Sequence, residues 1–181
     1  MMIRNPRMLK ETFASCNEEL RALGDRSELS SYLNVNQLLS KSFLLSCASF
    51  YEYEIVTVVR KVVQSGTFYS PVIEWLDKAA VDGQFYKWFN FRSAKNTNTF
   101  LATFGREFKD NVRSVIDHRD SRKQSETDFL ELCRKRNESV HRNYAAYSLD
   151  LTIDEIYAKH KSAMCFIRIV EYGARRWLIK P

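Results

Sequence analysis

Residues 54–63 read EIVTVVRKVV, and the way this stretch folds decides the class of the whole chain. β-Branched residues are enriched in strands, so composition alone would favour a buried strand here. The spacing favours a helix, because apolar residues recur at helical intervals from Ala48 to Val59 and no turn residue directly adjoins the stretch. We therefore expect one long helix over residues 36–64, closed by Gly66.

Other segments repeat the helical pattern, and strand signals are nearly absent elsewhere. The chain has only 5 Gly and 3 Pro in 181 residues, which leaves few turns and favours long helices. Capping-box patterns begin two segments, at Ser125-x-x-Asp128 and Thr152-x-x-Glu155. Helices are expected over residues 5–24, 69–80, 98–120 (a short helix and then a longer one), 125–144 and 151–178.

These elements predict an all-α fold, an antiparallel helical bundle with two long central helices and additional shorter helices. We expect a single domain over residues 1–181, in which residues 1–34 form an N-terminal helical appendage and residues 36–181 form the core bundle. The charged residues 117–126 are expected to form an exposed loop.

The net charge of +6 and the pI of about 9.2 favour acidic partners, of which nucleic acid is the usual one. The 4 cysteines are far apart and form no C-x-x-C pair, so we interpret them as buried thiols of a reducing compartment. We find neither a signal-peptide pattern nor an uncharged apolar run of about 18 residues. We therefore expect a cytoplasmic protein that does not bind a membrane.

The stretch CRKRNESVHRNY, residues 133–144, has polar side chains where a buried helix face requires apolar ones. Cys133 and Val140 belong to its apolar stripe. Three polar residues are expected to point inward within the same stripe, namely Arg136, Asn137 and His141. Inward polar groups are costly unless they are paired or line a cleft, and function is one common reason to retain them.

These three side chains suit the cleavage of RNA by its own 2′-hydroxyl group. Histidine can act as general acid or base, arginine can bind and stabilise a phosphate, and asparagine can orient the imidazole. This chemistry requires no metal, and the sequence has no Asp/Glu/His cluster at ligand spacing. The flanking Arg134, Lys135 and Arg142 can steer RNA phosphates. The alternative is a buried Arg–Glu–His network that only locks the helices together.

Three other features have simpler interpretations. A second Arg-x4-His pattern, from Arg113 to His118, flanks its helix stripe, so both residues are expected to be solvated and structural. His160 lies on the polar side of its helix and is expected at the surface. The aromatic run FYKWFNFR, residues 85–92, is expected to pack in the core or a dimer interface, with base stacking as the alternative.

Residues 133–144 resemble the signature helix of the HEPN superfamily, in which apolar residues precede Arg-Asn, three further residues and His. The segment SCASFYEYEIVTVVRKV, residues 46–62, is similar to the small-aromatic-aromatic-Glu segment of HEPN-type ribonucleases, including the ribonuclease-LS-like and stand-alone defence branches. Glu52 is the matching acid. It also lies in the inward stripe of its own helix, which predicts a contact across the core with the Arg–His pair.

The resemblance implies a metal-independent endoribonuclease without a cofactor that leaves a 2′,3′-cyclic phosphate and acts as a toxin or phage-defence effector. It implies RNA as substrate, a homodimer with a composite active site, and an antitoxin or other defence-system partner. By the same resemblance, Arg136 binds phosphate, His141 is the acid–base residue, Asn137 orients it, and Glu52 holds Arg136 or His141. Asn143 stands where the branch with a nucleotidyltransferase antitoxin has tyrosine, which argues against that partner. The alternative is a catalytically inactive HEPN-like module that binds RNA or a protein.

Overall fold

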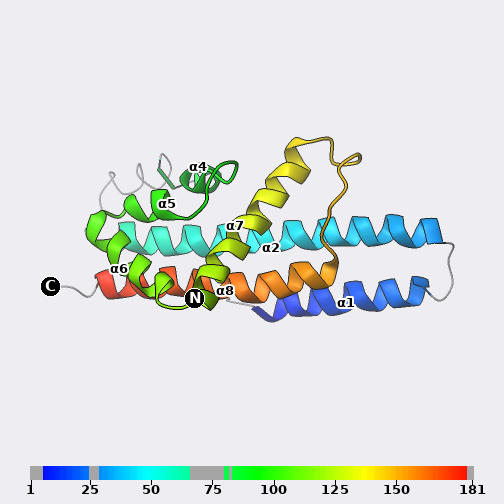
Figure 1. The fold of residues 1–181 in the computed structure, drawn as a ribbon, viewed down its shortest axis with the longest axis horizontal. Coiled ribbons are helices and arrows are strands. Elements are labelled where there is room, and N and C mark those ends of the chain that lie inside the picture. Colours follow the sequence, from blue (N-terminus) through cyan, green and yellow to red (C-terminus); the bar gives the residue numbers. More distant parts are fainter. Residues whose placement is uncertain (1–5, 25–28, 66–79, 82, 179–181) are drawn as a thin grey trace.

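The structure is a computed structural model that describes residues 6–24, 29–65, 80–81 and 83–178. Within these residues it contains helices and no strand, so the predicted all-α class is confirmed (Figure 1). The helices are α1 (Pro6–Gly24), α2 (Leu29–Ser65), α4 (Phe85–Phe89), α5 (Asn98–Ala102), α6 (Arg106–Asp117), α7 (Asp120–His141) and α8 (Ile153–Leu178). The helix expected over residues 69–80 lies outside the described residues, apart from residue 80.

The two long helices α2 and α8 lie side by side along the longest axis and run in the same direction (Figure 1). α1 runs antiparallel to α2 and packs against α2 and α8, while α7 crosses both long helices. The short helices α4, α5 and α6 gather near the end at which α2 and α8 finish. The β-branched stretch 54–63 lies inside α2, which confirms its helical interpretation, although α2 begins at Leu29 rather than at residue 36.

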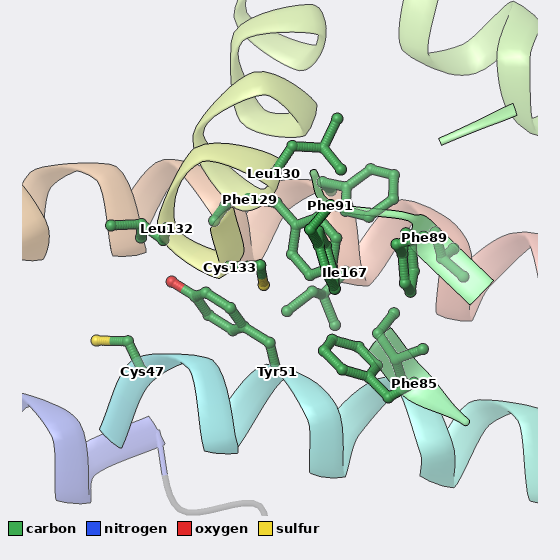
Figure 2. Packing of buried hydrophobic residues seen from close by; sticks show 14 of the residues in the cluster. Cys47, Tyr51, Phe85, Phe89, Phe91, Phe129, Leu130, Leu132, Cys133 and Ile167 are labelled. Atoms are coloured by element: carbon green, nitrogen blue, oxygen red, sulfur yellow. The ribbon is translucent and has the colours of Figure 1, made fainter. Parts of the chain in front are cut away.

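The core is aromatic where α2, α4, α7 and α8 meet (Figure 2). The ring of Phe129 lies 5.6 Å from that of Tyr51, 4.8 Å from that of Phe166 and 5.1 Å from that of Phe89. Phe89 also stacks on Phe91 with a centroid distance of 5.1 Å. The aromatic run of the sequence therefore packs in the core, as expected, and its buried phenylalanines are not free to stack on bases.

The start of α7 differs from the expected loop over residues 117–126, because the helix already begins at Asp120. Ser125 is consequently not an N-cap but lies inside the helix, where its hydroxyl donates to the carbonyl oxygen of Arg122 at 2.7 Å. Ser125 and Glu126 are both buried. Part of the charged stretch 117–126 is therefore buried, although its charge predicted an exposed loop.

The start of α8 follows the predicted capping box. The amide of Glu155 donates to Thr152 Oγ1 at 3.2 Å, and the Glu155 carboxylate accepts from the Thr152 amide at 2.8 Å. These hydrogen bonds to the carboxylate lower the pKa of Glu155. The capping box therefore fixes the point at which the chain re-enters the bundle after α7.

Arg113 of α6 forms a bidentate ion pair with Glu126 of α7, with nitrogen–oxygen distances of 2.8 and 3.0 Å. The side chains are only 18% and 8% exposed, so the expectation of a solvated Arg113 is wrong. The Glu126 carboxylate also accepts from the amide of Thr97 at 2.8 Å and from its hydroxyl at 2.6 Å. His118, the other end of this second pattern, is exposed, as expected.

The cysteines divide into two pairs by burial, and all four are free. Cys47 and Cys133 are buried, and this burial raises the pKa of both thiols. Cys16 is half-buried and Cys165 is exposed, so the expectation of a buried thiol is wrong for these two.

α2 is long and apolar enough between Leu29 and Gln64 to cross a membrane, judged by length and composition only. Of its most apolar window, 56% is buried inside the bundle, as is common for a core helix. The helix is therefore weak support for a membrane span.

His160 of α8 lies in the interior and is only 6% exposed, so its expected surface position is wrong. Its Nδ1 lies 3.0 Å from the Tyr51 hydroxyl, with which it shares a hydrogen bond, and the two rings stack at 5.7 Å. Burial lowers the pKa of His160 to about 4. The imidazole is therefore neutral in the folded chain at neutral pH.

This buried histidine is expected to make the fold sensitive to mild acid. The unfolded chain takes up a proton at about pH 6.5, whereas the folded chain does so only near pH 4, so His160 reduces the free energy of unfolding as the pH falls between these values. The loss is about 3 kcal/mol across this window. Urea unfolding of the wild type and of His160→Gln at several pH values measures it. Equal pH dependence in the two proteins would contradict a neutral buried imidazole.

Candidate functional site

The C-terminal half of α7 rises away from α2 and α8 (Figure 1), and its side chains differ widely in exposure. Leu132 and Cys133 are buried, but Val140 is 46% exposed and His141 is exposed. Arg136 and Asn137 are half-buried. The predicted inward stripe is therefore wrong at Val140 and His141, because the covered face of this half of α7 contains Ser139, which is fully buried, instead of these two residues.

A pocket of about 430 Å³ lies between this end of α7 and the segment that contains α4. One wall comes from α7 and the residue after it, and the other from α4 and the residues that follow it. The pocket is lined by Arg134, Asn137, Glu138, His141 and Arg142 on the first wall and by Tyr86, Asn90, Phe91 and Arg92 on the second. Three arginines against one glutamate make it a basic pocket, suited to an anionic ligand.

The side chains of the pocket leave their charges available to a ligand. Within the part of the chain that the structure describes, Arg92, Arg134 and Arg142 form no ion pair and no side-chain hydrogen bond. The His141 ring likewise makes no hydrogen bond to a described residue. The pocket therefore combines permanent positive charge with an imidazole that can exchange protons with a bound molecule.

Arg136 lies behind the pocket wall rather than at its surface. Its guanidinium carbon lies 4.3 Å from the ring centroid of Tyr86, and its Nη1 donates to Asn137 Oδ1 at 3.2 Å. Its Nε is buried without a hydrogen-bond partner. Arg136 thus supports Tyr86 through a cation–π contact, which is worth about 0.5–2 kcal/mol.

Glu52 of α2 is half-buried, lies near Tyr86 and does not line the pocket. Burial raises the pKa of the Tyr86 phenol, the charge of Arg136 opposes this rise, and the charge of Glu52 adds to it. The buried phenol oxygen makes no hydrogen bond of normal geometry, so we treat Glu52 as its neighbour and not as a bonded partner. Among the described residues, Glu52 forms no hydrogen bond or ion pair with Arg136 or His141, so the expected contact across the core is not formed.

Lys135 lies away from the pocket, unlike Arg134 and Arg142. Its Nζ binds Asp150 in the connection between α7 and α8, at 2.6 Å from Oδ2. The hydrogen bond from Lys135 lowers the pKa of Asp150. Of the three cations expected to bind RNA, the structure brings two to the pocket and uses the third to fasten this connection.

Hydrogen bonds also join the connection after His141 to α2. The carbonyl oxygen of Tyr144 accepts from Lys41 Nζ at 3.1 Å. The Gln37 amide bonds both backbone groups of Leu149, at 2.9 and 3.0 Å. The chain that follows the last turn of α7 is therefore held against α2 at two points.

Sequence reasoning missed the second wall of the pocket, which contains Tyr86, Asn90 and Arg92. The available signal was the alternation of polar and apolar residues in the sequence from Asn90 to Arg92, inside an otherwise aromatic run. Asn90 adopts the left-handed conformation, with φ 46° and ψ 52°, which asparagine tolerates better than most residues. Glu138 was also missed, because one acid in a charged helix carries no distinctive pattern.

A helical bundle in which a crossing helix ends in Arg-Asn-x3-His beside a basic pocket fits the HEPN class. The sequence model of the family described as RiboL-PSP-HEPN matches residues 11–172. The chain therefore belongs to the RiboL-PSP-HEPN family, within the HEPN superfamily that the signature helix resembles. Neither the curated proteins nor the solved structures gave a significant match.

Proposed function

We propose that this protein is a metal-independent endoribonuclease that cleaves RNA through attack of a 2′-hydroxyl group. The observation that carries the proposal is the pocket in which His141 and Asn137 lie with Arg134 and Arg142. The position of His141 in the wall of a basic pocket supports an enzyme, because its imidazole is accessible to an anionic substrate, whereas the equally exposed His118 lies outside this pocket. Membership of a HEPN family is consistent with action on RNA.

In the proposed reaction, His141 removes the proton of a ribose 2′-hydroxyl. The 2′-oxygen then forms a bond to the adjacent phosphorus while the bond from phosphorus to the 5′-oxygen breaks. The leaving oxygen takes a proton from an acid, and the products are a 2′,3′-cyclic phosphate and a 5′-hydroxyl. Arg134 and Arg142 stabilise the negative charge that develops on the phosphate oxygens. Asn137 orients the imidazole only after RNA binds, because the two described side chains share no hydrogen bond in the free protein.

The roles proposed for Arg136 and Glu52 are more indirect. Arg136 lies on the Tyr86 ring and adds its charge to the field of the pocket, and it contacts a phosphate only after its side chain leaves that ring. Glu52, which also lies near Tyr86, offsets part of this charge. Lys135 orders the connection after α7 and in this way positions His141.

We also propose that the chain acts as a cytoplasmic homodimer in which two copies of His141 face one composite cleft. One imidazole would then act as the base and the other as the acid for the leaving oxygen. Further proposals from the family resemblance are a toxin or phage-defence role and control by an antitoxin or other defence-system partner.

The first test is incubation of the wild type with a mixed RNA pool in EDTA, beside a DNA pool of the same sequences. We expect cleavage of RNA only, because DNA lacks the attacking 2′-hydroxyl. The new ends are expected to be cyclic phosphates that resist phosphatase and 5′-hydroxyls that a polynucleotide kinase labels directly. Cleavage of DNA, or 3′-hydroxyl and 5′-phosphate ends, would exclude this mechanism.

One observation favours a second function, a catalytically inactive module that binds RNA or a protein. Arg136 is occupied by Tyr86 and Asn137 and does not line the pocket. If the wild type binds RNA but leaves it intact, this second function replaces the first.

A further inference from the structure

Arg92 lies on the wall of the pocket opposite the α7 arginines. It follows α4 in the sequence and belongs to neither of the segments that resemble the HEPN signatures. Arg92 is exposed, and within the described residues its guanidinium has no ion-pair or hydrogen-bond partner. An unpaired cation on a second wall means that a ligand in the pocket would meet positive charge from two sides.

The residues before Arg92 fix the position of its backbone. Asn90 turns the chain through its left-handed conformation, and its carbonyl oxygen accepts the amides of Ser93 and Ala94, both at 3.0 Å. Phe91, the next residue, is buried, with its ring 6.0 Å from that of Phe129 of α7 (Figure 2). The backbone on both sides of Arg92 is therefore fixed, and its guanidinium needs only side-chain rotation to reach a ligand.

We propose that Arg92 is a positioning residue that binds an RNA phosphate next to the phosphate held by Arg134 and Arg142. This inference rests on the proposed RNA-binding role of the pocket. Successive phosphates alternate with riboses along RNA, so cations on two facing walls can hold the phosphates on either side of one ribose. Attack by the 2′-oxygen requires that it lie in line with the phosphorus and the leaving oxygen, and two fixed phosphates restrict the backbone to such arrangements. The planar guanidinium suits a phosphate because it can donate two parallel hydrogen bonds.

The test is a binding titration with a short fluorescent 2′-O-methyl oligoribonucleotide, which cannot be cleaved, at several salt concentrations. Each phosphate contact on a single strand contributes about 0.7 to the slope of log affinity against log salt. Arg92→Gln is expected to lower this slope by about 0.7 and to weaken binding about tenfold. Arg92→Lys is expected to keep most of the slope because it keeps the charge.

The matched control is Arg106→Gln, which removes an arginine of α6 whose side chain is 93% exposed and outside the pocket. An equal slope change in Arg106→Gln and Arg92→Gln, no change in Arg92→Gln, or no RNA binding by the wild type would overturn the proposal for Arg92. Cleavage of unmodified RNA is measured in parallel. If the wild type cleaves RNA and Arg92→Gln has an unchanged slope, only the proposal for Arg92 is rejected. If Arg92→Gln has a lower slope but the wild type does not cleave RNA, the proposed nuclease activity is rejected and the phosphate contact of Arg92 is retained.

Discussion

His141→Ala is expected to cut RNA about 10²–10⁴ times more slowly than the wild type while remaining folded. General acid–base catalysis accelerates a reaction by a factor of this size, and the variant loses this acceleration together with its imidazole. Folding should be unaffected because His141 is exposed and makes no hydrogen bond to a described residue, so its removal leaves neither a cavity nor an unpaired partner. Single-turnover cleavage of a 5′-labelled RNA measures the rate, and thermal unfolding measures the fold.

The matched control is His118→Ala, which removes the other exposed histidine of an Arg-x4-His pattern, at the C-terminal end of α6. It should cut at the wild-type rate. If both variants cut equally well, or if His141→Ala is as active as the wild type, His141 is not the acid–base residue.

Arg134→Gln tests the phosphate contact separately, because it should slow cleavage while the imidazole is intact.

Glu126→Ala is expected to lower the free energy of unfolding by about 3 kcal/mol, because the largely covered Arg113 guanidinium loses its bidentate carboxylate and keeps only the exposed Asp117 and the Asn98 amide oxygen. The Thr97 amide and hydroxyl lose their acceptor in the same variant. Breaking a buried pair costs more than replacing it, so the double variant Arg113→Met, Glu126→Leu should recover the part of the loss that comes from the unpaired guanidinium, but not the part that comes from Thr97. Urea unfolding followed by circular dichroism gives both values.

An exposed pair provides the control for this prediction. Arg7 and Glu11 of α1 form an ion pair at 2.7 Å, with side chains 82% and 58% exposed. Solvent screens this pair, so Glu11→Ala should change the free energy of unfolding by less than about 1 kcal/mol. A similar loss in Glu11→Ala and Glu126→Ala would show that burial of the Arg113–Glu126 pair does not determine its contribution.

Local patterns predicted the helices well, and the positions they misjudged depend on distant partners. The stretch 54–63 was correctly predicted as helix because periodicity reports the environment of a whole face, whereas β-propensity reports single residues. Glu126 was placed in a loop because its partner Arg113 lies on another helix. His160 was placed at the surface because only the fold brings Tyr51 to it.

In the candidate site, too, local patterns predicted some residues, while others depend on distant parts of the chain. The signature helix gave His141 and Asn137, which line the pocket, but it could not show which face of this half of α7 is covered. Periodicity gives the face on which a residue lies, and it does not say whether another element covers that face. Arg92 was not predicted because it reaches the pocket only through the burial of Phe91 beside it.

The contact of Phe91 with Phe129 has a consequence for binding. Together with the contacts of Phe89 with Phe129 and of Arg136 with Tyr86, it joins the two walls of the pocket, so neither wall needs to be assembled when a ligand arrives. A ligand that enters such a preorganised pocket loses its own conformational freedom but does not order the protein. Its association should then be limited by diffusion and electrostatic attraction rather than by a slow closing step.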